Sequence, residues 1–299
     1  MALPTLTEAH IRKLLPGVDV VGAPLAGGQK LVFPCRMADS RFALKVMLTN
    51  PAAPQSSPDD YSVEVFDEAT ARAAREMSII AECVSPHIVK PGAIPPGRTE
   101  INGERVIYFS EEWIDGRDLR TIIRTDGPLP LAQIKSLGVG IAEAVKELWS
   151  KKKIHRDIKP ANIMRRNGAS TFVLLDMGIA FDVEDVSITA PGVIVGTMVY
   201  YSPEQIEFVR KRQMDFRSDL FSLGIVMYEA AAGRHPFWSA GMTSQQAVGN
   251  MLQVSPDPPV THRTDIPQQM NAIIMRLLAK QPHLRYRTCD DLLAALASV

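Results

Sequence analysis

A short polar loop holds the side chains whose types and spacing could do chemistry in this sequence. Residues 151–164 read KKKIHRDIKPANIM, in which Asp157 and Asn162 stand five positions apart with Lys159 between them. Asp157 could present a carboxylate to a substrate hydroxyl, Asn162 could offer an amide oxygen to a metal ion, and Lys159 could meet a negatively charged phosphate. Because the pair Lys159-Pro160 is too rigid for a helix interior, we expect a loop here.

An amphipathic helix is expected to lead into this loop, because apolar residues recur before it at spacings of four, four and three. These residues are Leu137, Ile141, Val145 and Leu148. Residues 218–233 predict a second helix that begins at a Ser/Asp cap and ends at Gly233, and residues 268–280 and 290–299 are also helical in pattern. The part of the chain after Gly116 is therefore predicted to be mainly α-helical.

The N-terminal third of the chain predicts an antiparallel sheet, because short apolar or β-branched segments alternate there with Gly, Pro and Ser. These segments are residues 18–25, 30–37 and 41–48. Asn102-Gly103, between extended segments at 99–101 and 104–109, predicts a hairpin, since both residues tolerate positive φ. Residues 67–83 predict one helix beside this sheet.

The composition predicts a folded protein without a strong attraction to nucleic acid or to an anionic membrane. The 299 residues include 33 Lys plus Arg and 33 Asp plus Glu, so the formal net charge is zero. The start of the chain lacks a signal-peptide pattern and no apolar window is long enough to cross a bilayer, so we expect a cytoplasmic protein. Cys35, Cys83 and Cys289 are widely spaced, which predicts reduced thiols rather than a disulfide or a zinc site.

The octapeptide HRDIKPAN at residues 155–162 resembles, position by position, the catalytic loop of the protein kinase family, and specifically the Ser/Thr type that occurs as eukaryotic-like kinases in bacteria. The resemblance covers residues 18–298. It implies an α+β, bilobal protein-kinase fold, with a small antiparallel β-sheet N-lobe that carries helix C and a larger, mainly α C-lobe. The expected division is an N-terminal extension helix over residues 1–17, an N-lobe over 18–112 and a C-lobe over 113–299, with a cleft between the lobes and no room for a second domain.

Further motifs follow in the order of the family and imply a nucleotide site. Lys45, at the end of FALK, matches the lysine that holds the α- and β-phosphates of ATP, and Glu76, in the predicted helix, matches the carboxylate that fixes this lysine. Glu64, Glu68 and Glu82 are rivals of Glu76 by composition only.

The resemblance also implies a magnesium site and the roles of the loop residues. Asp176, which ends the segment FVLLD and begins a DMG triplet, and Asn162 would hold Mg²⁺, or Mn²⁺ in its place, together with the phosphates of ATP. Asp157 would orient the attacking hydroxyl and accept its proton, and Lys159 would steady the γ-phosphate. The hinge backbone near Glu112 would take the adenine.

Other matches imply structural roles. The triplet Ser-Pro-Glu at 202–204 resembles the end of the activation segment of a kinase. The resemblance implies that Glu204 forms a buried ion pair with Arg285 and that Asp219 braces the catalytic loop. Arg156 would receive a phosphate carried by the activation segment.

The activation segment holds the candidate sites of regulation. Ser187 and Thr189 are the candidate sites of autophosphorylation, and the alternative is that they are simply exposed hydroxyls in an acidic loop. Lys159, two residues after the catalytic aspartate, and Thr197 favour Ser or Thr over Tyr as the acceptor, by analogy with the family.

The sequence departs from the family pattern in two places. Of the three glycines in the family's phosphate loop only Gly27 is present, with Gly28 beside it, while Leu25 and Lys30 take the outer positions. Glu111 takes the deep position beside the adenine, which is usually apolar, so an ionised Glu111 would need a partner or a raised pKa. We expect inhibitors that require an apolar deep pocket to bind poorly.

The function implied is an ATP-dependent protein kinase that transfers the γ-phosphoryl of MgATP to Ser/Thr hydroxyls of protein substrates. Two alternatives remain open. A pseudokinase acting as a binding or scaffold module is favoured by the weak glycine loop and by Glu111, but the presence of Lys45, Glu76, Asp157, Asn162 and Asp176 argues against it. A small-molecule phosphotransferase of the antibiotic or choline type is disfavoured by the Ser-Pro-Glu triplet and the Gly-Thr pair before it. The expected partners are protein substrates and a separate regulatory or sensor protein, with neither nucleic acid nor membrane.

Overall fold

The computed structural model describes most of the chain, as two compact units. The described residues are 6–27, 30–48, 70–71, 73–75, 77–101, 103–176, 198–207 and 214–299. Unit 1 contains Met1–Cys83 and Val89–Ile114, and unit 2 contains Val84–Ile88 and Asp115–Val299. Within the described ranges, no helix combines the length and the apolar character needed to cross a bilayer.

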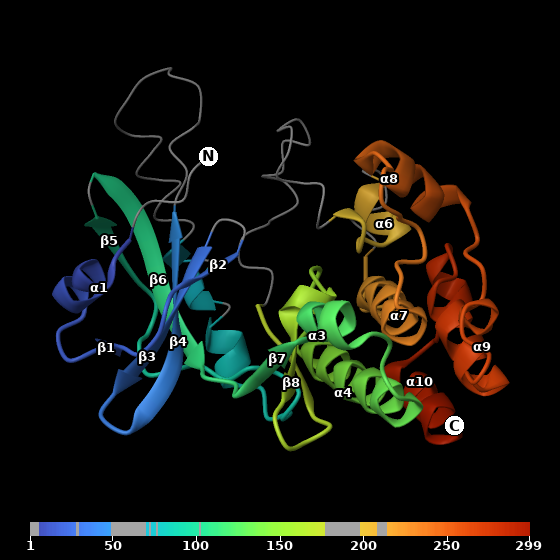
Figure 1. Ribbon diagram of the computed structural model, residues 1–299, viewed down its shortest axis with the longest axis horizontal. Helices are drawn as coiled ribbons and strands as arrows, with labels where there is room; N and C mark the ends of the chain where they lie inside the picture. Colours follow the sequence, from blue (N-terminus) through green and yellow to red (C-terminus); the bar gives the residue numbers. More distant parts are fainter. Residues whose placement is uncertain are drawn as a thin grey trace. The chain divides into compact units, whose positions relative to one another are not determined.

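Unit 1 is built on the antiparallel sheet that the sequence predicts (Figure 1). The strand order is β1-β3-β4-β6-β5, and β2 also pairs with β3. A short helix, α1 (Glu8–Leu14), precedes the sheet, and the described residues between 70 and 81 are helical. The strands are β1 (Asp19–Val20), β2 (Leu25–Gly27), β3 (Lys30–Met37), β4 (Ser40–Leu48), β5 (Gly97–Ile101) and β6 (Glu104–Glu112).

The loops of unit 1 follow the local sequence. The hairpin predicted at residues 102–103 is confirmed, since Ile101 pairs with Glu104 and Gly103 has a φ of 78°. The single strand predicted over 18–25 is wrong, because β1 stops at Val20 and β2 begins only at Leu25. Pro24 lies in this gap, and a proline has no N–H to donate to a strand ladder.

Unit 2 is mainly helical, as the sequence predicts (Figure 1). A small antiparallel sheet of β7 (Gly116–Asp118), β8 (Ile163–Arg166) and β9 (Phe172–Leu174) accompanies the helices. The helices are α3 (Leu119–Asp126), α4 (Leu131–Ser150), α6 (Pro203–Ile206), α7 (Arg217–Ala232), α8 (Ser244–Gln253), α9 (Gln268–Leu277) and α10 (Cys289–Ala297), with 3-10 turns η1 (Pro160–Asn162), η3 (Pro259–Thr261) and η4 (Pro282–Leu284).

Helix α4 confirms the predicted apolar face, because all four residues on that face are fully buried. Helix α7 corrects one prediction. It starts at Arg217 after Phe216, so Ser218 and Asp219 lie inside the helix and do not cap it. The predicted end is confirmed, since Gly233 adopts a left-handed φ of 70° at the C-terminus.

Gly116 in β7 shows why a residue without a side chain is needed where two strands approach closely. A Cβ atom placed on Gly116 would overlap the backbone carbonyl oxygen of Arg165 in β8. Because that obstacle is backbone, it cannot rotate away as a side chain could. The pairing of β7 with β8, the strand that directly follows the catalytic loop, therefore depends on this glycine.

All three cysteines are free and buried, in agreement with the expectation of reduced thiols. Burial raises the pKa of Cys35 to about 11, and burial with the neighbouring charge of Asp290 raises the pKa of Cys289 to about 12. Both thiols therefore stay protonated at neutral pH, which makes them poor nucleophiles and poor metal ligands.

Candidate active site

The predicted loop residues of unit 2 gather around the carboxylate of Asp157. The Nζ atom of Lys159 donates to both carboxylate oxygens of Asp157 at 2.8 Å. The side-chain amide of Asn162 donates to the Oδ2 atom of Asp157 at 2.7 Å and to its backbone carbonyl at 2.9 Å. The side chains of Asp157 and Lys159 are 16% and 17% exposed, so a substrate can still reach the carboxylate. The η1 turn brings the side chain of Asn162 to the carboxylate of Asp157, because it folds the chain back between the two residues.

Asp219 holds the backbone of the same loop from inside helix α7. Its carboxylate accepts the backbone N–H of His155 at 2.7 Å and the backbone N–H of Arg156 at 2.8 Å. Burial raises the pKa of Asp219, while His155 and the two backbone hydrogen bonds act in the opposite direction. Arg156 has a positive φ of 67°, which is unusual for a residue with a side chain. The bracing expected from the sequence is therefore visible as two hydrogen bonds that secure a strained turn.

Asp176 lies at the end of the segment that runs beside the loop. The backbone N–H of Leu175 donates to the carbonyl of Asn162 at 2.8 Å, and the carbonyl of Leu175 contacts the Nε2 atom of His155 at 3.0 Å. Asp176 itself has a positive φ of 51°, so the chain turns sharply at this carboxylate. These contacts place the backbone of Asp176 next to Asn162.

The donor set of this region suits a hard cation. The amide nitrogen of Asn162 is engaged by Asp157, and this orientation leaves the amide oxygen for a cation. Carboxylate and amide oxygens are ligands that Mg²⁺ accepts, together with the oxygens of a phosphate. Among the described residues no cluster of three or more His, Cys, Asp or Glu side chains could hold a metal.

Lys45 is buried in the sheet of unit 1 and forms an ion pair with Glu111. The lysine lies on β4 and the glutamate on the neighbouring strand β6, and their side chains are 4% and 3% exposed. The Nζ atom of Lys45 also lies 5.8 Å from the centre of the Phe109 ring. The partner that an ionised Glu111 needs in this position is therefore Lys45.

The hinge and the phosphate loop of unit 1 are described in part. Gly27 is the last residue of β2 and pairs with Lys30. The backbone N–H of Glu112 donates to the carbonyl of Lys90 at 2.8 Å, and its carboxylate accepts the N–H of Lys90 at 3.0 Å. Because this N–H is used within the protein, Glu112 would meet an adenine through its carbonyl.

Glu204 and Arg285 form the buried ion pair that the sequence pattern implies. The guanidinium of Arg285 donates to the two carboxylate oxygens of Glu204 at 2.6 and 2.9 Å. Its remaining hydrogen bonds go to the carbonyls of Ala279, Arg217 and Lys280. This pair ties the segment after residue 197 to the start of α7 and to the loop after α9.

Two further side chains, one in α7 and one just after it, contact the segment 198–202. His235 contacts the carbonyl of Val199 through Nε2 at 3.1 Å, while its Nδ1 atom accepts backbone N–H groups of Phe237 and Trp238 at 3.1 and 3.0 Å. Burial lowers the pKa of His235 to about 4, so the ring is neutral at pH 7. The hydroxyl of Tyr200 donates to Glu229 at 2.8 Å.

Several predicted residues fall outside the described residues. They are Gly28, Glu76, Ser187, Thr189 and Thr197. The roles assigned to them from the sequence remain predictions.

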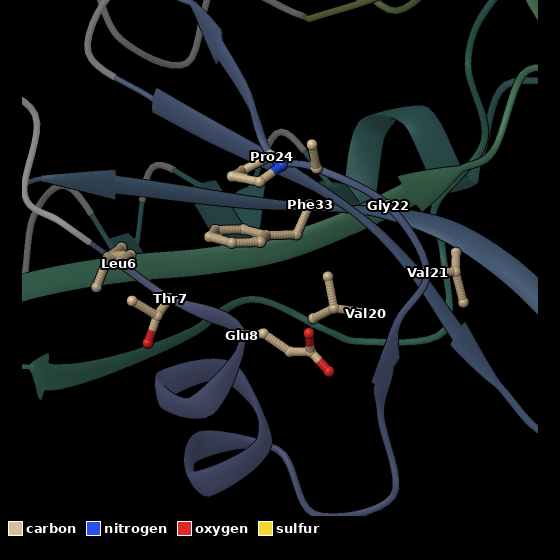
Figure 2. Close-up of a pocket in the computed structure, with 9 residues that line it drawn as sticks. Leu6, Thr7, Glu8, Val20, Val21, Gly22, Pro24 and Phe33 are labelled. Atoms are coloured by element: carbon tan, nitrogen blue, oxygen red, sulfur yellow. The ribbon is translucent and has the colours of Figure 1, made fainter.

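A separate hollow in unit 1, of about 620 Å³, lies where the start of α1 meets the strands, and its lining holds none of the predicted site residues. Figure 2 shows the ring of Phe33 between Leu6 and Val20 in this hollow. It is therefore distinct from the places where Lys45 and Asp157 lie.

Comparison with known proteins identifies the family. Residues 28–295 match the protein kinase domain. The chain belongs to the protein kinase domain family. Among curated relatives it is 34% identical to the serine/threonine-protein kinase PknB of Mycobacterium leprae over 229 residues, and 29% identical to a probable serine/threonine-protein kinase of Clostridium perfringens over 275 residues.

These alignments cover 76% and 91% of this chain but only 36% and 37% of the two relatives. The chain therefore spans about a third of the length of the curated relatives that it matches. Among solved structures, the kinase domain of Mycobacterium tuberculosis PknI matches with a TM-score of 0.64 at 22% identity, over 95% of this chain and 96% of that one. This likeness confirms the bilobal protein-kinase fold.

Some residues that shape this kinase site were not found from the sequence. Gln205 donates its side-chain amide to the carbonyl of Arg156 at 3.0 Å, and burial together with the charge of Asp157 raises the pKa of Tyr201 to about 12. No local pattern marks either residue. Glu111 carried a signal, because a carboxylate in a buried strand predicts a partner, but the sequence could not name Lys45 as that partner.

Proposed function

We propose that this chain is a serine/threonine protein kinase that transfers the γ-phosphoryl group of MgATP to hydroxyls of protein substrates. The observation that carries the proposal is the cluster of Asp157, Lys159 and Asn162, in which a partly exposed carboxylate is held by a cation and an amide. The relatives named above are serine/threonine-protein kinases, which supports the choice of acceptor. The pseudokinase alternative gains no support from these comparisons.

In this proposal the loop residues act mainly by position and charge. The two hydrogen bonds from Lys159 and the one from Asn162 hold the carboxylate of Asp157 in one orientation. Asp157 can then orient a substrate hydroxyl and accept its proton, while Lys159 steadies the γ-phosphate. Asn162 and Asp176 would hold Mg²⁺, or Mn²⁺ in its place, which when bound neutralises charge on the phosphates.

For unit 1 the proposal concerns nucleotide binding. Lys45 would contact the α- and β-phosphates, Gly27 and Gly28 would approach them through their backbone N–H groups, and the hinge carbonyl of Glu112 would face the adenine. Glu76 remains the partner of Lys45 that the family pattern suggests.

Regulation through the activation segment is a further part of the proposal. A phosphate on Ser187 or Thr189 would dock on Arg156, whose backbone is already fixed by Asp219 and Gln205. Mass spectrometry after incubation with MgATP tests this idea. An active enzyme with an unmodified segment would contradict it.

The partners and the location that we propose follow from the family and the sequence. Protein substrates, a separate regulatory protein and a cytoplasmic setting are the expectation. Pull-down of the chain from its own cells, with and without MgATP, is the measurement that would identify such partners.

The decisive experiment uses ATP labelled in its γ-phosphate, Mg²⁺ and casein as a generic acceptor. Wild type should label casein on Ser and Thr, and Asp157→Asn should lose at least about 99% of this rate because the proton acceptor is gone. Asp290→Asn is the matched control, since Asp290 is an exposed aspartate that pairs with Lys146. If wild type binds MgATP but labels nothing, the chain is a scaffold and the proposal is wrong.

A further inference from the structure

The ion pair between Lys45 and Glu111 is built into the centre of the unit 1 sheet. Strands β4 and β6 pair continuously from Phe42 opposite Glu112 to Leu48 opposite Val106. In this register Lys45 lies opposite Phe109, and Glu111 lies opposite Ala43, one step along the same face. The two charged side chains therefore meet diagonally across neighbouring strands.

Both charges are removed from water. As whole residues Lys45 is 3% exposed and Glu111 is 2% exposed. A buried ammonium or carboxylate is costly unless a charge of opposite sign lies beside it, so each group stabilises the charged form of the other. The ammonium is further confined by the ring of Phe109, 5.8 Å away.

The anchor of this pair is rigid. Both backbones are fixed by the same strand ladder, so the separation of the two backbone positions is set by the pairing of β4 with β6. A separate helix can move as a body relative to a sheet, whereas the backbone that carries Glu111 belongs to the same sheet as Lys45. The position of the ammonium is therefore set within the sheet itself.

We propose that Glu111 is a positioning residue for nucleotide binding: from the neighbouring strand it holds the ammonium of Lys45 in the place where it meets the phosphates of a nucleoside di- or triphosphate. This inference rests on the proposed kinase function and adds a second carboxylate to it. In this scheme Glu111 does not touch the phosphates but acts on them through Lys45.

The test is a double-mutant cycle read by calorimetry with MgADP, which requires no phosphate transfer. Glu111→Gln keeps the shape and removes the charge, and it should weaken MgADP binding roughly tenfold while weakening adenosine binding much less, because adenosine carries no phosphate for Lys45 to meet. In the Lys45→Met background the same substitution should change MgADP binding less than about twofold. Glu100→Gln, on the exposed face of β5 in the same sheet, is the matched control and should bind like wild type.

A further variant distinguishes loss of positioning from loss of folding. Glu111→Asp keeps the buried charge and should bind MgADP more tightly than Glu111→Gln, with circular dichroism confirming the fold of each protein. Three results would each overturn the positioning role. The first is that Glu111→Gln loses as much MgADP affinity in the Lys45→Met background as in wild type, the second is that it binds MgADP more tightly than wild type, and the third is that Glu111→Asp binds MgADP no more tightly than Glu111→Gln. If wild type itself binds no MgADP, the proposed function fails first, which distinguishes the two conclusions.

Discussion

Removing the guanidinium of Arg285 should destabilise unit 2 more than any surface change. The side chain is fully buried and makes five hydrogen bonds, two to Glu204 and three to the carbonyls of Ala279, Arg217 and Lys280. The substitution Arg285→Leu fills much of the volume but leaves each of these acceptors without this donor.

The expected magnitude follows from the buried charge. Breaking a buried ion pair by removing one partner costs about 3 to 5 kcal/mol, because the remaining charge stays in a medium of low dielectric. Glu204, at 5% exposure, is the charge left behind. For a unit of this size a loss of about 4 kcal/mol lowers the Tm by roughly 10 °C.

The assay is urea-induced unfolding and thermal unfolding, followed by circular dichroism, of wild type and three variants. Arg12→Leu is the matched control, since Arg12 forms an ion pair with Glu8 at the surface, with side chains 58% and 50% exposed, and such pairs contribute less than about 1 kcal/mol. The double variant Glu204→Leu/Arg285→Leu should be more stable than Arg285→Leu alone, because it no longer buries a single charge. If Arg285→Leu costs no more than Arg12→Leu, or if the double variant is the less stable of the two, the reasoning is refuted.

Two further predictions concern pH and close packing. The pKa of His235 is lowered to about 4 in the folded protein, so between pH 7 and pH 5 the unfolded chain binds a proton at this residue and the folded protein does not. The free energy of unfolding should therefore fall by about 2 kcal/mol between these two pH values. Urea unfolding at pH 7 and pH 5 should show a smaller fall for His235→Asn, and an equal fall in the variant would exclude His235 as the cause. Gly116→Ala should cost about 2 kcal/mol or more because its Cβ overlaps the carbonyl of Arg165, whereas Gly249→Ala in helix α8 meets no atom within 4 Å and should be slightly stabilising. Equal effects of the two glycine substitutions on the Tm would contradict this explanation.

The sequence alone determined the features that depend on neighbours along the chain. The buried face of α4, the hairpin at residues 102–103 and the cluster of Asp157 with Asn162 are all fixed by spacings of five residues or fewer, where helix, turn and loop geometry decide which side chains meet. Glu204 and Arg285 are too far apart in the sequence for local geometry to pair them. Their ion pair could be predicted only because the motifs resemble those of a known family.

Only the tertiary structure decided how distant charges are matched. Lys45 and Glu111 are 66 residues apart, and the register of β4 against β6 selects this carboxylate. Asp219 is 64 residues from His155. The family resemblance implies that Asp219 braces the loop, but only the tertiary structure shows that its carboxylate accepts the backbone N–H groups of His155 and Arg156. A buried charge must find its partner wherever the packed chain brings one, and that location depends on register and packing, which no local pattern of residues encodes.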